Sequence, residues 1–455
     1  HVQLATASKM FCGCPTDYAG AAPDTHVCPI CLGMPGVLPV INRKAVEYTL
    51  LTGLALNAEI PEATKFDRKN YPYPDLVKGY QISQYDLPLV KGGFVEITGE
   101  DGQPRRIRLE RVHLEEDTGK LTHVTDGSLV DFNRSGVPLM EMVTQPDLRA
   151  PYEAQAYLQK LRAILRTLGV SRADMEKGQL RCDVNVSLRP IGQTELGTKV
   201  EVKNLNSFRA VFRSLEFEIE RQARLLDKGE RIIQETRGWV EERAATVTQR
   251  TKEEAHDYRY FPEPDLPPLF VSREWVAELR ARLPELPDAR GARYRQAFGL
   301  GAYDADQLSI DSSRASFLEA TIAAGADPKK AANWIQNELK GQPGALRPAH
   351  LAEIIGLVDD GSISGTSARQ VLQAVLDTGK QPRALVDELG LGQVSDAGAL
   401  EQAVVDAIAA NPAAVADYRA GKASAINFLK GQVMRTTRGK ANPAVAEDLL
   451  RKRLA

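Results

Sequence analysis

Two proline-rich segments divide this chain into parts that follow different patterns. They are FPEPDLPPLF at 261–270 and LPELPD at 283–288. Before them, strand-like and helix-like patterns both occur, whereas after them the pattern is helical with no strand-like alternation. Proline clusters of this kind interrupt regular structure and mark boundaries. The sequence therefore predicts an α+β fold, with a mixed N-terminal region followed by all-α regions.

Regular elements of the mixed region can be read from hydrophobic spacing. Apolar residues three and four apart predict amphipathic helices over 151–168 and from about Ser207 to Gly229. The stretch 94–117 has a strand pattern on each side of a Gly/Asp/Pro turn, which predicts an antiparallel hairpin. Between the two helices, 182–188 and 199–203 alternate with a period of two, as strands do.

One face of these two alternating strands is polar. It presents Asp183 and Asn185 from the first strand and Lys203 from the second. Asp and Asn are poor strand formers, so their alternation indicates a face that is used. A plain solvated sheet face is the other interpretation. We expect Asp183, Asn185 and Lys203 to contribute to cofactor binding.

Four of the five cysteines lie within twenty residues, in the order C-x-C, thirteen residues, then C-x-x-C. They are Cys12, Cys14, Cys28 and Cys31. Two short-range thiol pairs on turns can converge into the tetrahedral thiolate site that Zn²⁺ prefers. Two disulfides or four free thiols are the alternatives, and His26 could replace one thiol. We predict a closed, structural zinc site.

Hard oxygen and nitrogen ligands gather where the predicted hairpin ends. RVHLEEDTGK supplies His113, Glu115 and Glu116, and DFNRSGVPLMEM supplies Glu141. Carboxylates and a histidine at strand ends suit Mg²⁺ that holds a nucleotide phosphate. A solvated acidic cluster is the alternative interpretation.

Three cations near this cluster could neutralise phosphate charge: Arg134, Lys120 and Lys69. Lys69 belongs to KFDRKNYPYPDLVKGYQISQYDLP, a tyrosine-rich, proline-stiffened stretch that fits the wall of a substrate channel or an ordered connector. Neither a phosphate-loop motif nor a dinucleotide-binding fingerprint occurs in the sequence.

Charge is unevenly distributed along a nearly neutral chain. The totals of 58 basic and 60 acidic residues give a net charge of −2. From Asn411 onward, however, nine basic residues face three acidic ones, a net charge of +6. Such a patch can hold a phosphate backbone without reading its sequence. A solvated helical face is the alternative.

The motifs together resemble the B subunits of the tRNA-dependent amidotransferases, and the matching stretches span essentially the whole chain in order. They are HVQLATASKMFC, KFDRKNYPYPD, YQISQYD, HLEEDTGK, SLVDFNRSGVPLMEMV, GQLRCDVNVSLR, KVEVKNLNSF, DYRYFPEPDLPPL and INFLKGQVMRTTRGKANP.

This resemblance implies a catalytic cradle domain whose antiparallel sheet is similar to that of glutamine synthetase (residues 1–285), a helical domain (286–395) and a tRNA-binding tail domain (396–455). It also implies binding of ATP and Mg²⁺. The expected reaction is ATP-dependent phosphorylation of the side-chain carboxylate of Glu-tRNA(Gln), Asp-tRNA(Asn) or both. Ammonia would then displace phosphate.

Site residues carry over from the resemblance at matching positions. His1 matches a metal-binding histidine, and a glutamate expected two positions before it lies beyond the start of the chain. Glu115, Glu116 and Glu141 match the acidic ligands. We expect one of Glu115 and Glu116 to bind Mg²⁺ and the other to face the ammonia channel with Lys69. The four-cysteine zinc knot occurs in some members only.

Partners also follow from the resemblance: an amidase (A) subunit that releases ammonia from glutamine, a small C subunit, tRNA, and a non-discriminating aminoacyl-tRNA synthetase. The sequence lacks a secretory leader and an apolar run of about 18 residues, so we expect a cytoplasmic protein without membrane contact. Two alternatives are a non-catalytic tRNA-binding scaffold and an inactive fragment that lacks a first strand.

Overall fold

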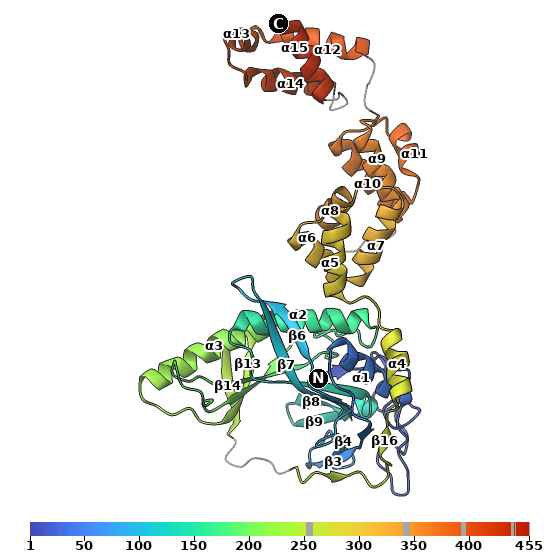
Figure 1. Cartoon of the computed structure of the whole chain (residues 1–455), viewed down its shortest axis with the longest axis vertical. Coiled ribbons are helices and arrows are strands. Elements are labelled where there is room, and N and C mark those ends of the chain that lie inside the picture. The colour runs from blue at the N-terminus through green and yellow to red at the C-terminus, as the bar shows by residue number, and fades with distance from the viewer. Residues whose placement is uncertain (252–257, 340–345, 393–396, 438–440, 442, 455) are drawn as a thin grey trace. The chain divides into compact units, whose positions relative to one another are not determined.

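The computed structural model describes residues 1–251, 258–339, 346–392, 397–437, 441 and 443–454. The chain forms two compact units, His1–Pro287 (unit 1) and Asp288–Ala455 (unit 2). Unit 1 contains all the strands of the described residues, whereas unit 2 is helical (Figure 1). This arrangement confirms the predicted α+β class.

Unit 1 is built on several small sheets. Its strands are β1 (Val2–Gln3), β2 (Ala63–Thr64), β3 (Asp67–Asn70), β4 (Tyr80–Ser83), β5 (Val90–Lys91), β6 (Phe94–Thr98), β7 (Pro104–Glu116), β8 (Lys120–Val124), β9 (Gly127–Asp131), β10 (Pro138–Thr144), β11 (Cys182–Val186), β12 (Val200–Leu205), β13 (Glu235–Val240), β14 (Ala245–Thr251), β15 (Phe261–Pro262) and β16 (Leu269–Phe270). The largest sheet has the order β1-β10-β7-β5, with β6 also paired to β7, and a second has the order β11-β12-β13-β14. The predicted hairpin is the β6–β7 pair, which is antiparallel.

One strand pair departs from the expected antiparallel arrangement. β12 and β13 pair in parallel, and helix α3 (Phe208–Asp227) connects them. Parallel neighbours need a crossover of this kind because a tight turn cannot join them. The predicted strands at 182–188 and 199–203 are β11 and β12, which pair antiparallel to each other.

Helices α1 (Arg43–Ala55), α2 (Pro151–Thr167) and α3 cover these sheets, and α4 (Arg273–Ala281) packs against α1. Helix α1 packs against β5 and β7, α2 packs against β6 and α3, and α3 packs against β11, β12 and β14. The side chain of Asn42 caps α1 by accepting from two backbone N–H groups, and Ser207 caps α3. The two long predicted helices therefore form the apolar layer behind both sheets.

Unit 2 consists of helices alone in the described residues. They are α5 (Pro287–Phe298), α6 (Ala302–Ile310), α7 (Ser312–Ala323), α8 (Pro328–Asn337), α9 (Pro348–Asp359), α10 (Gly365–Thr378), α11 (Pro382–Glu388), α12 (Ala397–Ala410), α13 (Pro412–Arg419), α14 (Ala425–Thr436) and α15 (Pro443–Leu454). Two separate hydrophobic clusters lie within this unit, one over 294–386 and one over 400–454. The predicted boundary between 395 and 396 lies outside the described residues, and that between 285 and 286 stays a prediction.

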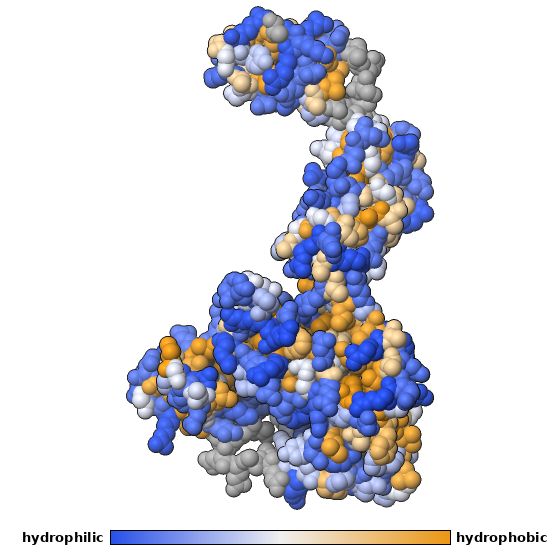
Figure 2. Space-filling view, viewed as in Figure 1, coloured by the Kyte–Doolittle hydropathy of each residue, from blue (hydrophilic) through white to orange (hydrophobic). Residues whose placement is uncertain are grey.

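Apolar side chains are also exposed on unit 1. Figure 2 shows hydrophobic residues on the side of unit 1 where α4 and β16 lie. Phe270 of β16 is 73% exposed, and Leu38 and Val40 are 65% and 71% exposed. No helix of the described residues is long and apolar enough to cross a membrane.

Candidate active site and metal centres

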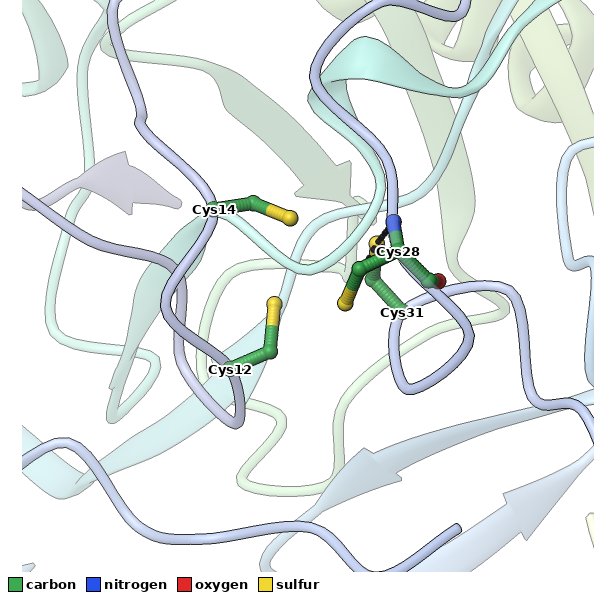
Figure 3. A group of neighbouring side chains, drawn as sticks. All are labelled: Cys12, Cys14, Cys28 and Cys31. Atoms are coloured by element: carbon green, nitrogen blue, oxygen red, sulfur yellow. Dashed lines mark hydrogen bonds between the residues drawn. The ribbon is translucent and has the colours of Figure 1, made fainter.

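The four clustered cysteines converge on one point in unit 1. Figure 3 shows the sulfurs of Cys12 and Cys14 pointing toward those of Cys28 and Cys31. The four Sγ atoms all lie within 4.8 Å of one another, and the Sγ atoms of Cys28 and Cys31 are 3.9 Å apart. In a tetrahedral site with Zn–S bonds of about 2.3 Å, sulfurs are about 3.8 Å apart. The donor set and its spacing therefore fit Zn²⁺.

Local backbone structure brings the two cysteine pairs together. A bridge between Ser8 and Pro15 closes the turn that carries the first pair, and Leu32 N–H donates to the carbonyl of Cys28 in the second turn. A hydrogen bond with the Cys12 thiol lowers the pKa of Cys31 to about 5, and the charge of Lys9 acts in the same direction. A thiolate, the form that binds metals, is thus favoured at this position.

A second group of ligands lies on the largest sheet. His1, Glu115 and Glu141 each offer one ligand atom within 4.8 Å of the others. His1 Nδ1 lies 3.5 Å from Glu115 Oε1 and 3.6 Å from Glu141 Oε2. His113 stands beside them, with Nε2 3.3 Å from Glu141 Oε2. A nitrogen with two carboxylates is a ligand set that suits a hard divalent cation such as Mg²⁺.

Strand register explains this convergence. In the antiparallel pair of β7 and β10, Glu141 lies opposite His113, and Met140 lies opposite Leu114. Because side chains alternate between faces, Leu114 and Met140 enter the core while the ligand residues lie on the other face. Val2 of β1 pairs with Met140, which brings His1 alongside Glu141.

Charge is concentrated at this group. Burial lowers the pKa of His1, but hydrogen bonds with Asp183 and Glu115 and the charge of Glu141 overcome this and raise it to about 10. Burial raises the pKa of Glu115, but His1 and His113 outweigh it and hold that pKa well below its ordinary value. The carboxylates therefore strongly stabilise nearby positive charge. The two histidines provide that charge here, and a divalent cation can also provide it.

A cavity of about 880 Å³ adjoins the ligand group. His1, Glu141, Asp183 and Asn185 belong to its lining, and apolar residues of α2 and α3 complete it. Asp183 Oδ2 lies 3.7 Å from His1 Nε2 and 2.8 Å from Lys203 Nζ. Pockets that bind cofactors have volumes of about 300–1,000 Å³ and combine apolar walls with a few polar groups. The cavity has the size and composition of such a pocket.

Glu115 and Glu116, which the sequence could not tell apart, lie on opposite faces of β7. Glu115 belongs to the ligand group, whereas Glu116 pairs with Lys78 and accepts from the Ile82 N–H at 3.0 Å. The structure therefore does not bring Glu116 into the ligand group. Nor does it pair Glu116 with Lys69, whose Nζ lies 4.9 Å from the ring centre of Tyr258.

The other two cations predicted to neutralise phosphate charge, Arg134 and Lys120, lie around the 117–120 turn. Arg134 donates to the carbonyls of Thr118 and Gly119 at 2.9 and 2.7 Å, so it braces this turn. Lys120 is exposed at the start of β8. Neither residue belongs to the cavity lining or to the ligand group.

Two charged residues that support the site were missed. Lys78, the partner of Glu116, has no distinguishing signal in the sequence. Arg181, which pairs with the buried Asp117 at 2.5 Å, directly precedes β11 and shares the alternation of Asp183. Extending the predicted polar face by one more alternate residue, from Asp183 back to position 181, would have included Arg181.

The basic C-terminal segment is partly neutralised. Lys430 and Arg451 both pair with Glu447 at 2.7 Å, and Lys422 pairs with Asp417 at 3.3 Å. The other basic residues of the prediction are Arg419, Arg435, Arg438, Lys440, Lys452 and Arg453. Among these, Arg438 and Lys440 lie outside the described residues.

A candidate metal-ligand group at the edge of a cofactor-sized cavity, in an α+β unit followed by helices, is typical of the catalytic subunit of an enzyme. Comparison with protein families narrows this class. The family of the GatB/GatE catalytic domain matches residues 1–277, and that of the GatB domain matches residues 316–454. The chain therefore belongs to the GatB family.

Full-length relatives agree with this assignment. The chain is 52% identical to a protein of Carboxydothermus hydrogenoformans, with 100% of this chain and 97% of the relative covered. It is 54% identical to a protein of Thermomicrobium roseum (100% and 97%) and 53% identical to one of Moorella thermoacetica (100% and 98%). Each relative is named as the B subunit of an aspartyl/glutamyl-tRNA(Asn/Gln) amidotransferase.

Proposed function

We propose that this chain is the catalytic B subunit of a tRNA-dependent amidotransferase. It phosphorylates the side-chain carboxylate of Glu-tRNA(Gln), Asp-tRNA(Asn) or both with ATP, and the product is amidated to Gln-tRNA(Gln) or Asn-tRNA(Asn). The observation that supports this most is the group of His1, Glu115 and Glu141 beside the 880 Å³ cavity. Family membership supports the same assignment.

In this proposal the ligand group holds Mg²⁺ and the cavity takes ATP. Bound Mg²⁺ would offset the negative charge of the phosphates and of the substrate carboxylate, which otherwise repel each other. His1, Glu115 and Glu141 hold the cation. Asp183, Asn185 and Lys203 lie on β11 and β12 beside the group. Lys203 does not line the cavity itself but pairs with Asp183 of the lining at 2.8 Å, and from there its charge can attract phosphate oxygens.

Amidation needs ammonia to reach the activated carboxyl carbon without escaping into water. Ammonia attacks that carbon, the bond between it and the phosphate oxygen breaks, and inorganic phosphate leaves with one proton from the nitrogen. We assign Glu116 and Lys69 to the ammonia path. Glu116 is 4% exposed and faces away from the ligand group, and Lys69 lies among the tyrosines of the 67–85 stretch and Tyr258.

We further propose that Cys12, Cys14, Cys28 and Cys31 bind one structural Zn²⁺. All four coordination positions would be filled by thiolates, so this site stabilises the 8–36 segment and leaves no position for a substrate. The donor spacing described above supports this assignment.

Partners complete the proposal. We assign ammonia supply to an amidase (A) subunit, with a small C subunit in the same complex, and suggest that the cognate non-discriminating synthetase associates with it. The exposed apolar side chains of unit 1 are of the kind that a partner subunit covers. We propose a cradle (1–285), a helical domain (286–395) and a tail (396–455) that holds tRNA, in a cytoplasmic complex.

A phosphorylation assay with both tRNAs tests this function. Glu-tRNA(Gln) and Asp-tRNA(Asn) are incubated with the assembled complex and ATP labelled at the γ-phosphate. We expect label on at least one aminoacyl-tRNA, dependent on Mg²⁺. A complex that retains tRNA but transfers no label to either one contradicts the proposal and favours a tRNA-binding scaffold.

A further inference from the structure

A fully buried lysine lies beside the cysteine cluster. Lys9 has 0% of its side chain exposed. Its Nζ donates to the carbonyl of His26 at 2.7 Å and lies 3.5 Å from the carbonyl of Phe132 and 3.7 Å from Cys31 Sγ. Among the described residues, no carboxylate forms an ion pair with Lys9. Burying an ammonium without a nearby anion is strongly unfavourable.

The cysteine cluster supplies the missing negative charge when a divalent metal occupies it. Four thiolates around one such ion leave two net negative charges. Cys31, the most buried of the four at 4% exposed, is the cysteine that Lys9 approaches. The negative charge of the metal-loaded cluster therefore compensates the buried ammonium of Lys9, whereas four neutral thiols would leave that ammonium without a counter-charge.

Lys9 also connects the cluster to the turn that leads into β10. Lys9 Nζ lies near the Phe132 carbonyl of this turn. The backbone N–H of the next residue, Met10, donates to the carbonyl of Gly136 at 2.7 Å. From the cysteine loop, the His26 N–H donates to Asn133 Oδ1 at 2.7 Å. This turn contains Arg134, which braces residues 118 and 119, and it precedes the strand of Glu141.

We propose that Lys9 is a positioning residue of the metal-loaded cluster. Its ammonium offsets the excess charge of the thiolates, and its contacts link the cluster to the 132–136 turn. Loss of the metal then reduces the negative charge opposite Lys9 and loosens that turn. This inference rests on the proposed zinc site.

Metal retention in Lys9→Met tests the electrostatic part. The full-length chain is mixed with a chromogenic chelator, and the rate of zinc release is compared with that of Lys44→Met, a control at a half-exposed lysine that pairs with Glu47. Substitution of a group that supports metal ligands costs about 10- to 100-fold in affinity, so we expect release at least about tenfold faster from Lys9→Met. Equal release from the two variants overturns the role of Lys9, and a parent chain without metal overturns the zinc site as well.

A second background separates charge compensation from ordinary packing. Lys9→Met is introduced into Cys28→Ser/Cys31→Ser, and hydrogen exchange is measured over residues 132–137. With the cysteines intact, we expect Lys9→Met to reduce protection. Without them, it should leave protection unchanged or increase it, because the lone ammonium is removed. If Lys9→Met fails to fold only when the cysteines are intact, the proposal is supported. If Lys9→Met lowers protection equally in both backgrounds, or misfolds in both, the proposal is overturned.

Discussion

Asp117→Asn tests how the end of β7 is held beside the ligand group. Asp117 is 2% exposed and accepts from Gln3 Nε2 at 2.7 Å and from Arg181 Nη2 at 2.5 Å. Removing one member of a buried ion pair costs about 3–5 kcal/mol. Because the Arg181 side chain is 34% exposed, water compensates part of this loss, and we expect about 2–4 kcal/mol.

Hydrogen exchange over 112–118 and 137–142 measures this cost where it arises. At about 1.36 kcal/mol per tenfold change, protection should fall by about 30-fold to about 1,000-fold. The control is Asp147→Asn, whose partner Arg108 is 67% exposed, although the two are only 2.7 Å apart. An exposed pair contributes about 0–1 kcal/mol, so protection should change by less than about fivefold. Equal effects of the two variants would refute the reasoning from burial.

The same substitution has a defined pH dependence. Burial raises the pKa of Asp117, but the charges of Arg181 and Arg134 outweigh this, so its pKa in the folded chain lies below its ordinary value. A lowered carboxyl pKa contributes stability that is fully present above the unfolded pKa of about 3.9 and is lost as pH falls through the folded pKa. The difference between the parent and Asp117→Asn should therefore be constant near neutral pH and shrink in acid.

Three further predictions follow from burial and charge. Leu114→Ala should cost about 2–5 kcal/mol of unfolding free energy in denaturant, because Leu114 is 0% exposed, whereas Leu129→Ala at a 64% exposed site should cost less than about 0.5. Elemental analysis should find about one zinc per chain, lost in Cys28→Ser/Cys31→Ser and retained in Cys182→Ser; zinc retained by the double variant contradicts the site. Lys203→Met should raise the ATP concentration for half-saturation about tenfold, as expected for loss of a charge-assisted hydrogen bond. The control is Lys177→Met, at an exposed lysine, which should leave this concentration unchanged. An unchanged value for Lys203→Met counts against this role.

Hydrophobic spacing was sufficient to predict the elements that cover the sheets. Helices α2 and α3 begin within one residue of the predicted positions because their apolar stripes face one continuous core. The alternation in β11 was equally informative, since Val186 is buried in that core while Asp183 and Asn185 on the other face are exposed.

The arrangement of the site could be predicted only in part. Alternation shows that Glu115 and Glu116 point to opposite faces, but which face meets His1 depends on the pairing of β7 with β10 and of β10 with β1. These pairings join residues far apart in the chain, and no local pattern specifies them. The parallel pairing of β12 with β13 escaped prediction for the same reason.

The central claim is that His1, Glu115 and Glu141 hold the Mg²⁺ used in phosphoryl transfer. Its most direct test is single-turnover transfer of the labelled γ-phosphate of ATP to Glu-tRNA(Gln) or Asp-tRNA(Asn) by the assembled complex containing Glu141→Gln. The control is Glu96→Gln, at a half-exposed glutamate of β6. We predict a rate at least about 100-fold lower for Glu141→Gln, partly restored by higher Mg²⁺, and a parental rate for the control. Transfer by Glu141→Gln at the parental rate and the parental Mg²⁺ requirement would contradict the account.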